Sequence, residues 1–285
     1  MSRQYLFLLP FVLSSVVAAQ EPPEPSSETQ EASSVQMAQM TPHNCPIKDW
    51  VGREAELEEL LRTAEVVSVE DIGVGVTKPL SAILKKGDMQ FKAAFKPIKR
   101  GRAGGFWESY EAEVAAYELD KMLGLNMVPP TVVRKIDKKK GSLQLWANDC
   151  KLYGDVMNVV PATPAWSHQL SRMKIFDNLI LNEDRNARNF LVDPGFDIIL
   201  IDHSRAFLSK KKIGKGNKLP TQYDRQLMER AQALDKEQLE AQLKDILMGG
   251  QIKAIIARRD KLVEHMEKMI AERGEHNVMF DEGTP

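Results

Sequence analysis

The first half of the chain alternates apolar and polar positions, whereas the second half has mostly helical spacing. Strand-like alternation begins at residues 65–69 and returns at 81–84 and 90–96, with the turn Lys86-Gly87-Asp88 before the last segment. Short alternating runs bounded by turn residues indicate β-strands. We therefore predict a three-stranded meander, followed by strands at 128–133 and 142–146 that a basic turn at 134–141 connects.

Apolar residues three or four positions apart mark the helices. This spacing predicts helices at 49–64, 107–123, 167–181, 224–234, 236–247 and 251–272. Between the third and fourth, residues 190–192 and 198–201 read as two short strands around the turn Asp193-Pro-Gly-Phe-Asp197. We expect an α+β protein with a β-rich N-terminal lobe at 45–148, a mainly helical C-terminal lobe at 149–275 and a tail at 276–285.

The N-terminus differs in composition from this domain. Residues 1–19 combine Arg3, a short apolar run and the small residues Val17-Ala-Ala19, which is typical of a signal peptide that is cleaved on export. An uncleaved membrane anchor is the alternative. Residues 20–44 are rich in Pro, Glu, Ser and Gln, so we predict a disordered linker. We expect an exported protein, either secreted, periplasmic or in a secretory-pathway lumen, with no transmembrane segment after cleavage.

Overall composition is that of an ordinary globular protein. The 285 residues are 43% hydrophobic and 28% charged, with a formal net charge of −1, which gives no general attraction to nucleic acid. We expect a monomer and no nucleic-acid partner. Cys45 and Cys150 could form a disulfide in an exported chain, or remain two free thiols.

The candidate chemistry centres on residues 173–207. Asp184 and Asn189 have the D-x-x-x-x-N spacing of a kinase catalytic loop, in which Asp directs the attacking hydroxyl and Asn holds a metal. Asp202 follows the predicted hairpin, so it should return to the neighbourhood of Asn189. Carboxylate and amide oxygens are hard ligands suited to Mg²⁺. The alternative is an ordinary surface hairpin with an acidic turn.

Further residues precede this stretch in the order that kinases use. Gly73 and Gly75 form a G-x-G between two strands, where backbone N–H groups could approach phosphate, although a plain hairpin turn looks the same. Lys96 ends a strand, and Glu113 lies on the helix that follows. A strand lysine paired with a helical glutamate positions ATP phosphates in kinases. A solvated surface lysine is the alternative.

The segments AAFKP, EVAAYELDKMLGLNMVPPTV, GSLQLW, FDNLILNEDRNARNF and IDHSRAF resemble the atypical kinases of the phosphatidylinositol 3-/4-kinase-like group. The resemblance covers about residues 65–210. Within the group, the chain most resembles type II phosphatidylinositol 4-kinases, secretory-pathway protein kinases and HipA-type kinases. It implies a two-lobed protein-kinase-like fold, a hinge to adenine at 146–153, and an intact site. In that site Lys96 would bind phosphates, Glu113 would pair with Lys96, Asp184 would be catalytic, and Asn189 and Asp202 would bind metal.

Several positions depart from the pattern of these relatives. His203-Ser204-Arg205 replaces the glycine-containing sequence common after the metal-binding Asp, and Asn186 and Ala187 stand where several relatives have His or Gly. None of these differences removes a ligand.

The resulting expectation is an exported kinase that uses ATP with Mg²⁺ or Mn²⁺ to phosphorylate a hydroxyl, preferably on protein. A phosphatidylinositol kinase and a non-catalytic nucleotide-binding module remain alternatives. Lysines at 210–218 could attract an acidic substrate or lipid headgroup, or could simply be solvated. Asp177 could brace the catalytic loop or lie solvated on its helix.

Overall fold

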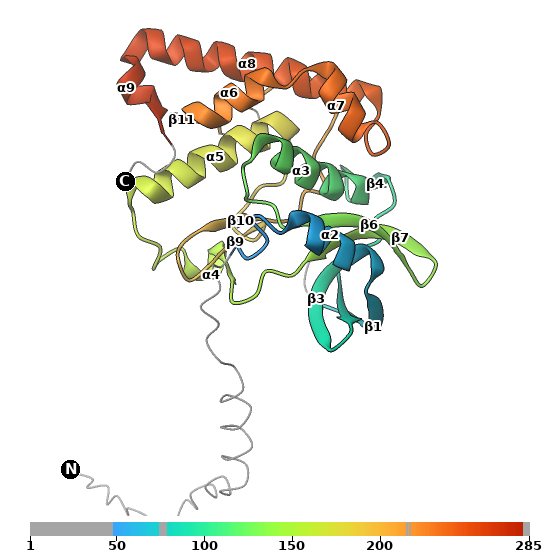
Figure 1. The fold of residues 1–285 in the computed structure, drawn as a ribbon. Helices are drawn as coiled ribbons and strands as arrows, with labels where there is room; N and C mark the ends of the chain where they lie inside the picture. The colour runs from blue at the N-terminus through green and yellow to red at the C-terminus, as the bar shows by residue number, and fades with distance from the viewer. Residues whose placement is uncertain (1–47, 74–78, 215, 217, 282–285) are drawn as a thin grey trace, which may run out of the picture. The chain divides into compact units, whose positions relative to one another are not determined.

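A five-stranded antiparallel sheet occupies the first half of the described chain, and helices dominate the second half (Figure 1). The computed structural model describes residues 48–73, 79–214, 216 and 218–281. The predicted signal peptide at 1–19, the linker at 20–44 and Cys45 lie outside the described residues, as does Gly75. Within the described part of the chain, no helix is both long enough and apolar enough to span a membrane.

The N-terminal sheet has the strand order β1-β2-β3-β7-β6. Its strands are β1 (Glu65–Asp71), β2 (Leu80–Lys86), β3 (Met89–Lys96), β6 (Thr131–Ile136) and β7 (Lys139–Leu145). The predicted meander is present, since β2 pairs with both β1 and β3. Helix α2 (Glu54–Thr63) packs against β6 and β7, and its Leu61 enters the apolar core of this lobe.

The predicted basic turn at 134–141 is wrong in its extent. Strands β6 and β7 run on to Ile136 and from Lys139, so the turn itself is only Asp137-Lys138, both with positive φ. Most of the basic side chains in this segment lie on exposed strand positions. A long charged side chain on the solvent face of a strand hides the alternation that a sequence reading needs.

A small hairpin separates the sheet from the first large helix. Strands β4 (Gly101–Ala103) and β5 (Phe106–Glu108) pair with each other, and α3 (Tyr110–Leu123) starts two residues after β5. The prediction that the helix begins at Trp107 is therefore wrong. Ser109 sets the start, because its side chain accepts a hydrogen bond from the Ala112 N–H and caps the helix.

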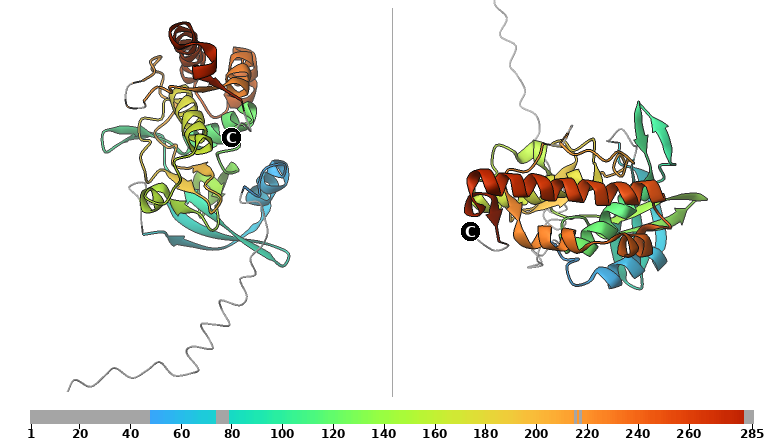
Figure 2. Two further views of the ribbon diagram at one scale, coloured as in Figure 1. Left: turned by 90° about the vertical axis from the view of Figure 1, so that its left-hand side faces the viewer. Right: turned by 90° about the horizontal axis from the view of Figure 1, so that it is seen from above.

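The C-terminal lobe begins with β8 (Lys151–Leu152), α4 (Tyr153–Val156) and α5 (Pro164–Ile180). The predicted hairpin follows as β9 (Phe190–Val192) and β10 (Ile198–Leu200), with Phe190 opposite Leu200. The remaining elements are β11 (Tyr223–Asp224), α6 (Arg225–Ala233), α7 (Lys236–Leu243), α8 (Gly249–Arg273), α9 (Glu275–Val278) and β12 (Met279–Phe280). Helix α8 packs against α5, α6 and α7 (Figure 2).

The lobe extends beyond the predicted boundary at residue 275. Residues 276–280, expected to belong to a tail, form the end of α9 and the strand β12, which pairs in parallel with β11. Val278 and Phe280 are buried, and the Phe280 ring stacks on His168. These contacts are made with α5 and β11, far away in the sequence.

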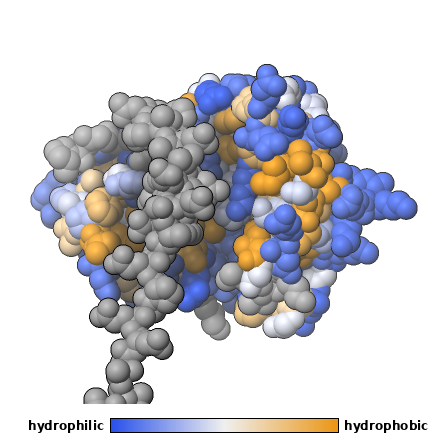
Figure 3. Space-filling model, turned by 90° about the horizontal axis from the view of Figure 1, so that it is seen from below, coloured by the Kyte–Doolittle hydropathy of each residue, from blue (hydrophilic) through white to orange (hydrophobic). Residues whose placement is uncertain are grey.

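The apolar side chains divide into a large core in the helical lobe and smaller clusters in the sheet lobe and beside α2. Figure 3 shows one face of the molecule, on which apolar areas remain among hydrophilic residues. Two of the most exposed apolar side chains, Met157 and Val159, follow α4. The polar groups described next come from the ranges 96–113 and 184–205, which also supply apolar side chains such as Phe190 and Leu200 to the large core.

Candidate active site

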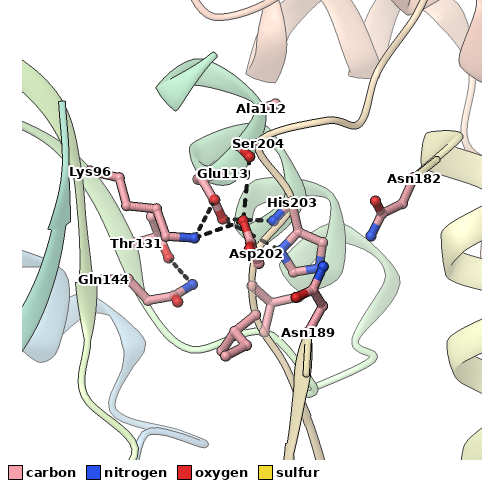
Figure 4. A network of polar contacts seen from close by, with 12 residues as sticks. Lys96, Ala112, Glu113, Thr131, Gln144, Asn182, Asn189, Asp202, His203 and Ser204 are labelled. Atoms are coloured by element: carbon pink, nitrogen blue, oxygen red, sulfur yellow. Dashed lines mark hydrogen bonds and ion pairs between the residues drawn. The ribbon is translucent and has the colours of Figure 1, made fainter. Parts of the chain in front are cut away.

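Three charged residues from distant parts of the chain meet where the sheet faces the helical lobe (Figure 4). Lys96 ends β3, Glu113 lies in the first turns of α3, and Asp202 follows β10. The Lys96 Nζ lies 2.6 Å from Glu113 Oε1 and 3.1 Å from Asp202 Oδ1. The predicted ion pair between Lys96 and Glu113 is therefore present, and Asp202 shares the same ammonium group.

This cluster is largely withdrawn from water. The side chain of Glu113 is 2% exposed and that of Lys96 10%. Burial acts to lower the pKa of Lys96, but the carboxylates of Asp202 and Glu113 outweigh it, so the pKa is raised. Burial acts to raise the pKa of Glu113, but Lys96 and the hydrogen bond from His203 lower it below its ordinary range. Both groups are consequently charged at neutral pH.

Asp202 has an unusual backbone conformation, with φ of 59° in the left-handed region. Its Oδ1 accepts hydrogen bonds from Lys96 and from the Ser204 hydroxyl. The next residue, His203, donates its backbone N–H to Glu113 Oε2 at 3.0 Å. The turn after β10 thus joins the metal-site candidate directly to helix α3.

Asn189 returns to the vicinity of Asp202 through the β9–β10 hairpin. Phe190 and Leu200 form the last pair of this hairpin, Asn189 and Asp202 lie just beyond it, and Figure 4 shows both at the site. The Asn189 Nδ2 donates to the backbone carbonyl of Asp184 at 2.7 Å, and its Oδ1 has no partner among the described residues. An amide held in this orientation keeps its oxygen available as a hard ligand.

Asp184 lies in the loop between α5 and β9. Its Oδ2 accepts a hydrogen bond from Arg205 Nη1 at 2.8 Å, and its side chain is 32% exposed. No described residue contacts Oδ1. The second side of the Arg205 guanidinium binds Glu108 at the end of β5. The sequence analysis did not identify Arg205 or Glu108 as part of the site, because 97 residues separate them.

Arg185 braces the loop that carries Asp184, a role that the sequence analysis also missed. Its guanidinium donates to Asp177 at 2.9 and 3.1 Å, and to the backbone carbonyls of Asn189 and Ile201. Asp177 is buried and also accepts from Asn182. Asp177 therefore supports the loop rather than facing solvent. The sequence offered no signal for Arg185 beyond its place next to Asp184.

His203 is fully buried between Arg185 and Glu113. Its Nε2 lies 2.9 Å from Arg185 Nη2, and its Nδ1 lies 3.7 Å from Glu113 Oε2. Burial lowers the pKa of His203, so the ring is neutral near pH 7. The neutral side chain adds no charge to the site.

The glycine-rich segment is only partly described. Strands β1 and β2 form the expected hairpin, and Gly73 has φ of 71° with its N–H bonded to Asp71 Oδ1. Gly75 falls within residues 74–78, outside the described part. A phosphate-binding role for Gly73 and Gly75 stays a prediction.

The segment expected to form the hinge connects β7 to β8. Trp146 donates its backbone N–H to the Lys92 carbonyl, and the Lys92 ammonium lies 3.7 Å from the Trp146 ring centroid. Cys150 is half-buried and has no disulfide partner among the described residues, and burial raises the pKa of its thiol to about 12. Such a thiol is protonated and unreactive near neutral pH. The predicted contact of residues 146–153 with adenine stays a prediction.

The described residues of the basic segment at 210–218 are anchored at several points. Lys210 pairs with Glu183 at 2.7 Å, and the buried Asn178 binds the Gly214 N–H and the Lys218 carbonyl. Buried Arg258 of α8 donates to the carbonyls of Leu208 and Lys210. These contacts hold the described residues of the segment near the loop that carries Asp184.

The sheet lobe, the helix carrying Glu113 and the hairpin ending at Asp202 together define a two-lobed protein-kinase-like fold, as predicted. No family model matches the sequence, and no curated protein matches it. The chain is similar in structure to hydra Fam20 with sugar, with a TM-score of 0.64 and 15% identity over 82% of this chain and 93% of that chain. It is also similar to the Golgi casein kinase with Mn/ADP bound, with a TM-score of 0.62 and 17% identity over 82% and 81% of the two chains. At these identities the comparisons establish the fold.

Proposed function

We infer that this protein is an ATP-dependent kinase that transfers the γ-phosphoryl group to a hydroxyl. The observation that carries this proposal is the charge cluster of Lys96, Glu113 and Asp202, in which one ammonium lies 2.6 and 3.1 Å from two carboxylates. In kinases the paired lysine contacts phosphates, and the aspartate after the hairpin binds metal. A cluster needed only for stability would not require charges, since apolar replacements of a buried ion pair are often as stable.

A divalent ion fits the polar groups that this chain presents. Asp202 offers a carboxylate, and Asn189 offers an amide oxygen whose orientation the bond to Asp184 holds. These are the hard oxygen donors that Mg²⁺ and Mn²⁺ prefer, with water completing the shell. Bound there with ATP, the ion would screen the charge of the phosphates. The Golgi casein kinase, which shares the fold, has been seen with Mn/ADP bound, which supports the choice of nucleotide and metal.

In the proposed reaction the oxygen of the acceptor attacks the γ-phosphorus, and ADP leaves. The hydroxyl proton passes to Asp184, whose Oδ1 has no partner among the described residues. Lys96 holds the phosphates in place, and Glu113 in turn holds Lys96. Positioning and electrostatics supply most of the acceleration in such transfers.

A protein hydroxyl is the proposed acceptor. Support comes from the shared fold with a kinase named for casein, and from the lysines at 210–212 and 218, of which Lys210 pairs with Glu183 next to Asp184; lysines there suit acidic sequences. The same lysines would suit an inositol lipid headgroup, so phosphatidylinositol is the second candidate. The proposed membership of the phosphatidylinositol 3-/4-kinase-like group rests on the sequence likeness. Export through residues 1–19 remains part of the proposal.

The test is a transfer assay with ATP labelled on its γ-phosphate and either Mn²⁺ or Mg²⁺. Casein, vesicles containing phosphatidylinositol, and the protein alone serve as acceptors. Label on casein that disappears in the Asp202→Ala variant supports the protein kinase, and label on lipid supports the alternative. Metal-dependent ATP binding without any transfer, including to water, would contradict the enzyme and favour a binding module.

A further inference from the structure

One guanidinium connects the proposed catalytic base to the hairpin in front of α3. Arg205 Nη1 lies 2.8 Å from Asp184 Oδ2, while Nε and Nη2 lie 2.7 and 2.6 Å from Glu108 Oε1. Two nitrogens of the guanidinium thus donate to a single oxygen of Glu108, and the third donates to Asp184. The Phe106 ring lies 4.2 Å from the guanidinium carbon, which closes one face of the group.

The three side chains of this arrangement differ in how far they are buried. The side chains of Arg205 and Glu108 are 11% and 7% exposed, whereas Asp184 is 32% exposed. Burial acts to lower the pKa of Arg205, but Glu108 and Asp184 outweigh it and raise this pKa, so the cation is permanent. The buried Arg205–Glu108 pair is therefore the fixed part of the arrangement, and it holds the more exposed Asp184 in place.

The same short segment is attached to α3 at two other points. The Ser109 N–H donates to the Ser204 carbonyl at 3.0 Å, and the His203 N–H donates to Glu113. Residues 202–205 consequently bind the hairpin end, the helix start and the glutamate that orients Lys96. A shift of α3 would move Asp184 through Arg205 as well as Lys96 through Glu113.

We propose that Arg205 is a positioning residue that holds Asp184 Oδ2 so that the other carboxylate oxygen, Oδ1, faces the acceptor hydroxyl. The proposal rests on the proposed kinase function and adds a residue to it. Lysine cannot replace arginine in this role, because a single ammonium cannot present separate, fixed donors to Glu108 and Asp184. Arg205 would set the rate of transfer without contacting ATP.

The experiment measures kcat, KM for ATP and thermal midpoint for Arg205→Lys and Glu108→Gln in the complete protein. We expect Arg205→Lys to lower kcat by about 10- to 100-fold, because small misplacements of a catalytic group have effects of this size. KM for ATP should stay within about 2-fold, since no change is made at Lys96 or Asp202. Glu108→Gln should lower kcat less, because the amide keeps an acceptor oxygen but loses the charge.

Arg225→Lys is the matched control. Arg225 also bridges two carboxylates, those of Glu275 and Asp281, but it lies at α6 on the exposed side of the helical lobe. The control variant should keep wild-type kcat and KM. A loss of kcat equal to that of Arg205→Lys would show a general effect of weakening the lobe and would overturn the proposal.

A double-variant cycle shows whether Arg205 acts through Asp184. In the Asp184→Asn background the base is absent, so Arg205→Lys should change the remaining rate by less than about 2-fold. Equal losses in both backgrounds, or wild-type kcat in Arg205→Lys alone, would overturn the proposal while leaving the kinase function intact. An inactive wild type would overturn both.

Discussion

Lys96→Met tests the energetics of the buried charge cluster. The substitution leaves Glu113, with a 2% exposed side chain, without its cation, although the hydrogen bond from the His203 N–H remains. Removing one partner of a buried pair typically costs about 3–5 kcal/mol of unfolding free energy. Asp202 adds less to this cost, because its side chain is 28% exposed and keeps the Ser204 contact.

The stability of the wild type and that of the variant should change with pH in opposite directions. In the wild type the pKa of Glu113 is lowered in the folded state. The stability that charged Glu113 contributes is therefore fully present above the ordinary pKa of a glutamate, and it is lost only as the pH falls towards the lowered folded-state pKa. In the variant the lowering effect of Lys96 is gone and burial remains, so the folded-state pKa rises. The folded variant then binds more protons than the unfolded chain, and its stability should fall as pH rises, by up to about 1.4 kcal/mol per unit.

Urea unfolding at several values between about pH 5 and 8 measures both effects. Lys121→Met is the matched control, because Lys121 also pairs with glutamates but is 35% exposed, and Glu58 keeps Arg62 and Tyr117 as partners. That variant should lose less than about 1 kcal/mol. Lys96→Met combined with Glu113→Gln should regain most of the lost stability. A Lys96→Met variant as stable as the control, or one whose stability does not change with pH, would refute the reasoning.

Three further predictions concern function and the C-terminus. Asp202→Ala should abolish Mn²⁺-dependent ATP binding in calorimetry, because only a neutral amide ligand remains at Asn189; unchanged affinity would contradict the metal assignment. Asp184→Asn should keep ATP affinity within a few-fold but lower the transfer rate by about 10²-fold or more, as loss of a general base does; equal activity would place the base elsewhere. For both, the same substitution at exposed Asp245 should have no effect. Phe280→Ala should cost about 3 kcal/mol in urea unfolding, since Phe280 is 7% exposed and stacks on His168; a loss below about 0.5 kcal/mol, as expected of an exposed position, would show that β12 is a dispensable tail.

Local sequence was enough for the features that depend on near neighbours. The β9–β10 hairpin is one of them, because two apolar runs joined by a short Pro-Gly turn are close enough in the chain to pair with each other. Its register then brings Asn189 toward Asp202, as the spacing predicted. The amphipathic pattern around Glu113 likewise placed it on a helix, and the strand ending at Lys96 followed from alternation.

Other features followed from tertiary contacts that no local pattern encodes. Helix α3 starts later than predicted because β5 pairs with β4. The segment predicted as a tail contains β12, because β11, 56 residues earlier, offers it a free edge. The largest gain is Arg205, whose partners Glu108 and Asp184 lie 97 and 21 residues away. Period and spacing report which face of an element is buried, but they carry no information on which distant charge meets it. Only the packing of β5 and α3 against the segment 202–205 decided that an arginine beside the candidate catalytic loop holds both carboxylates.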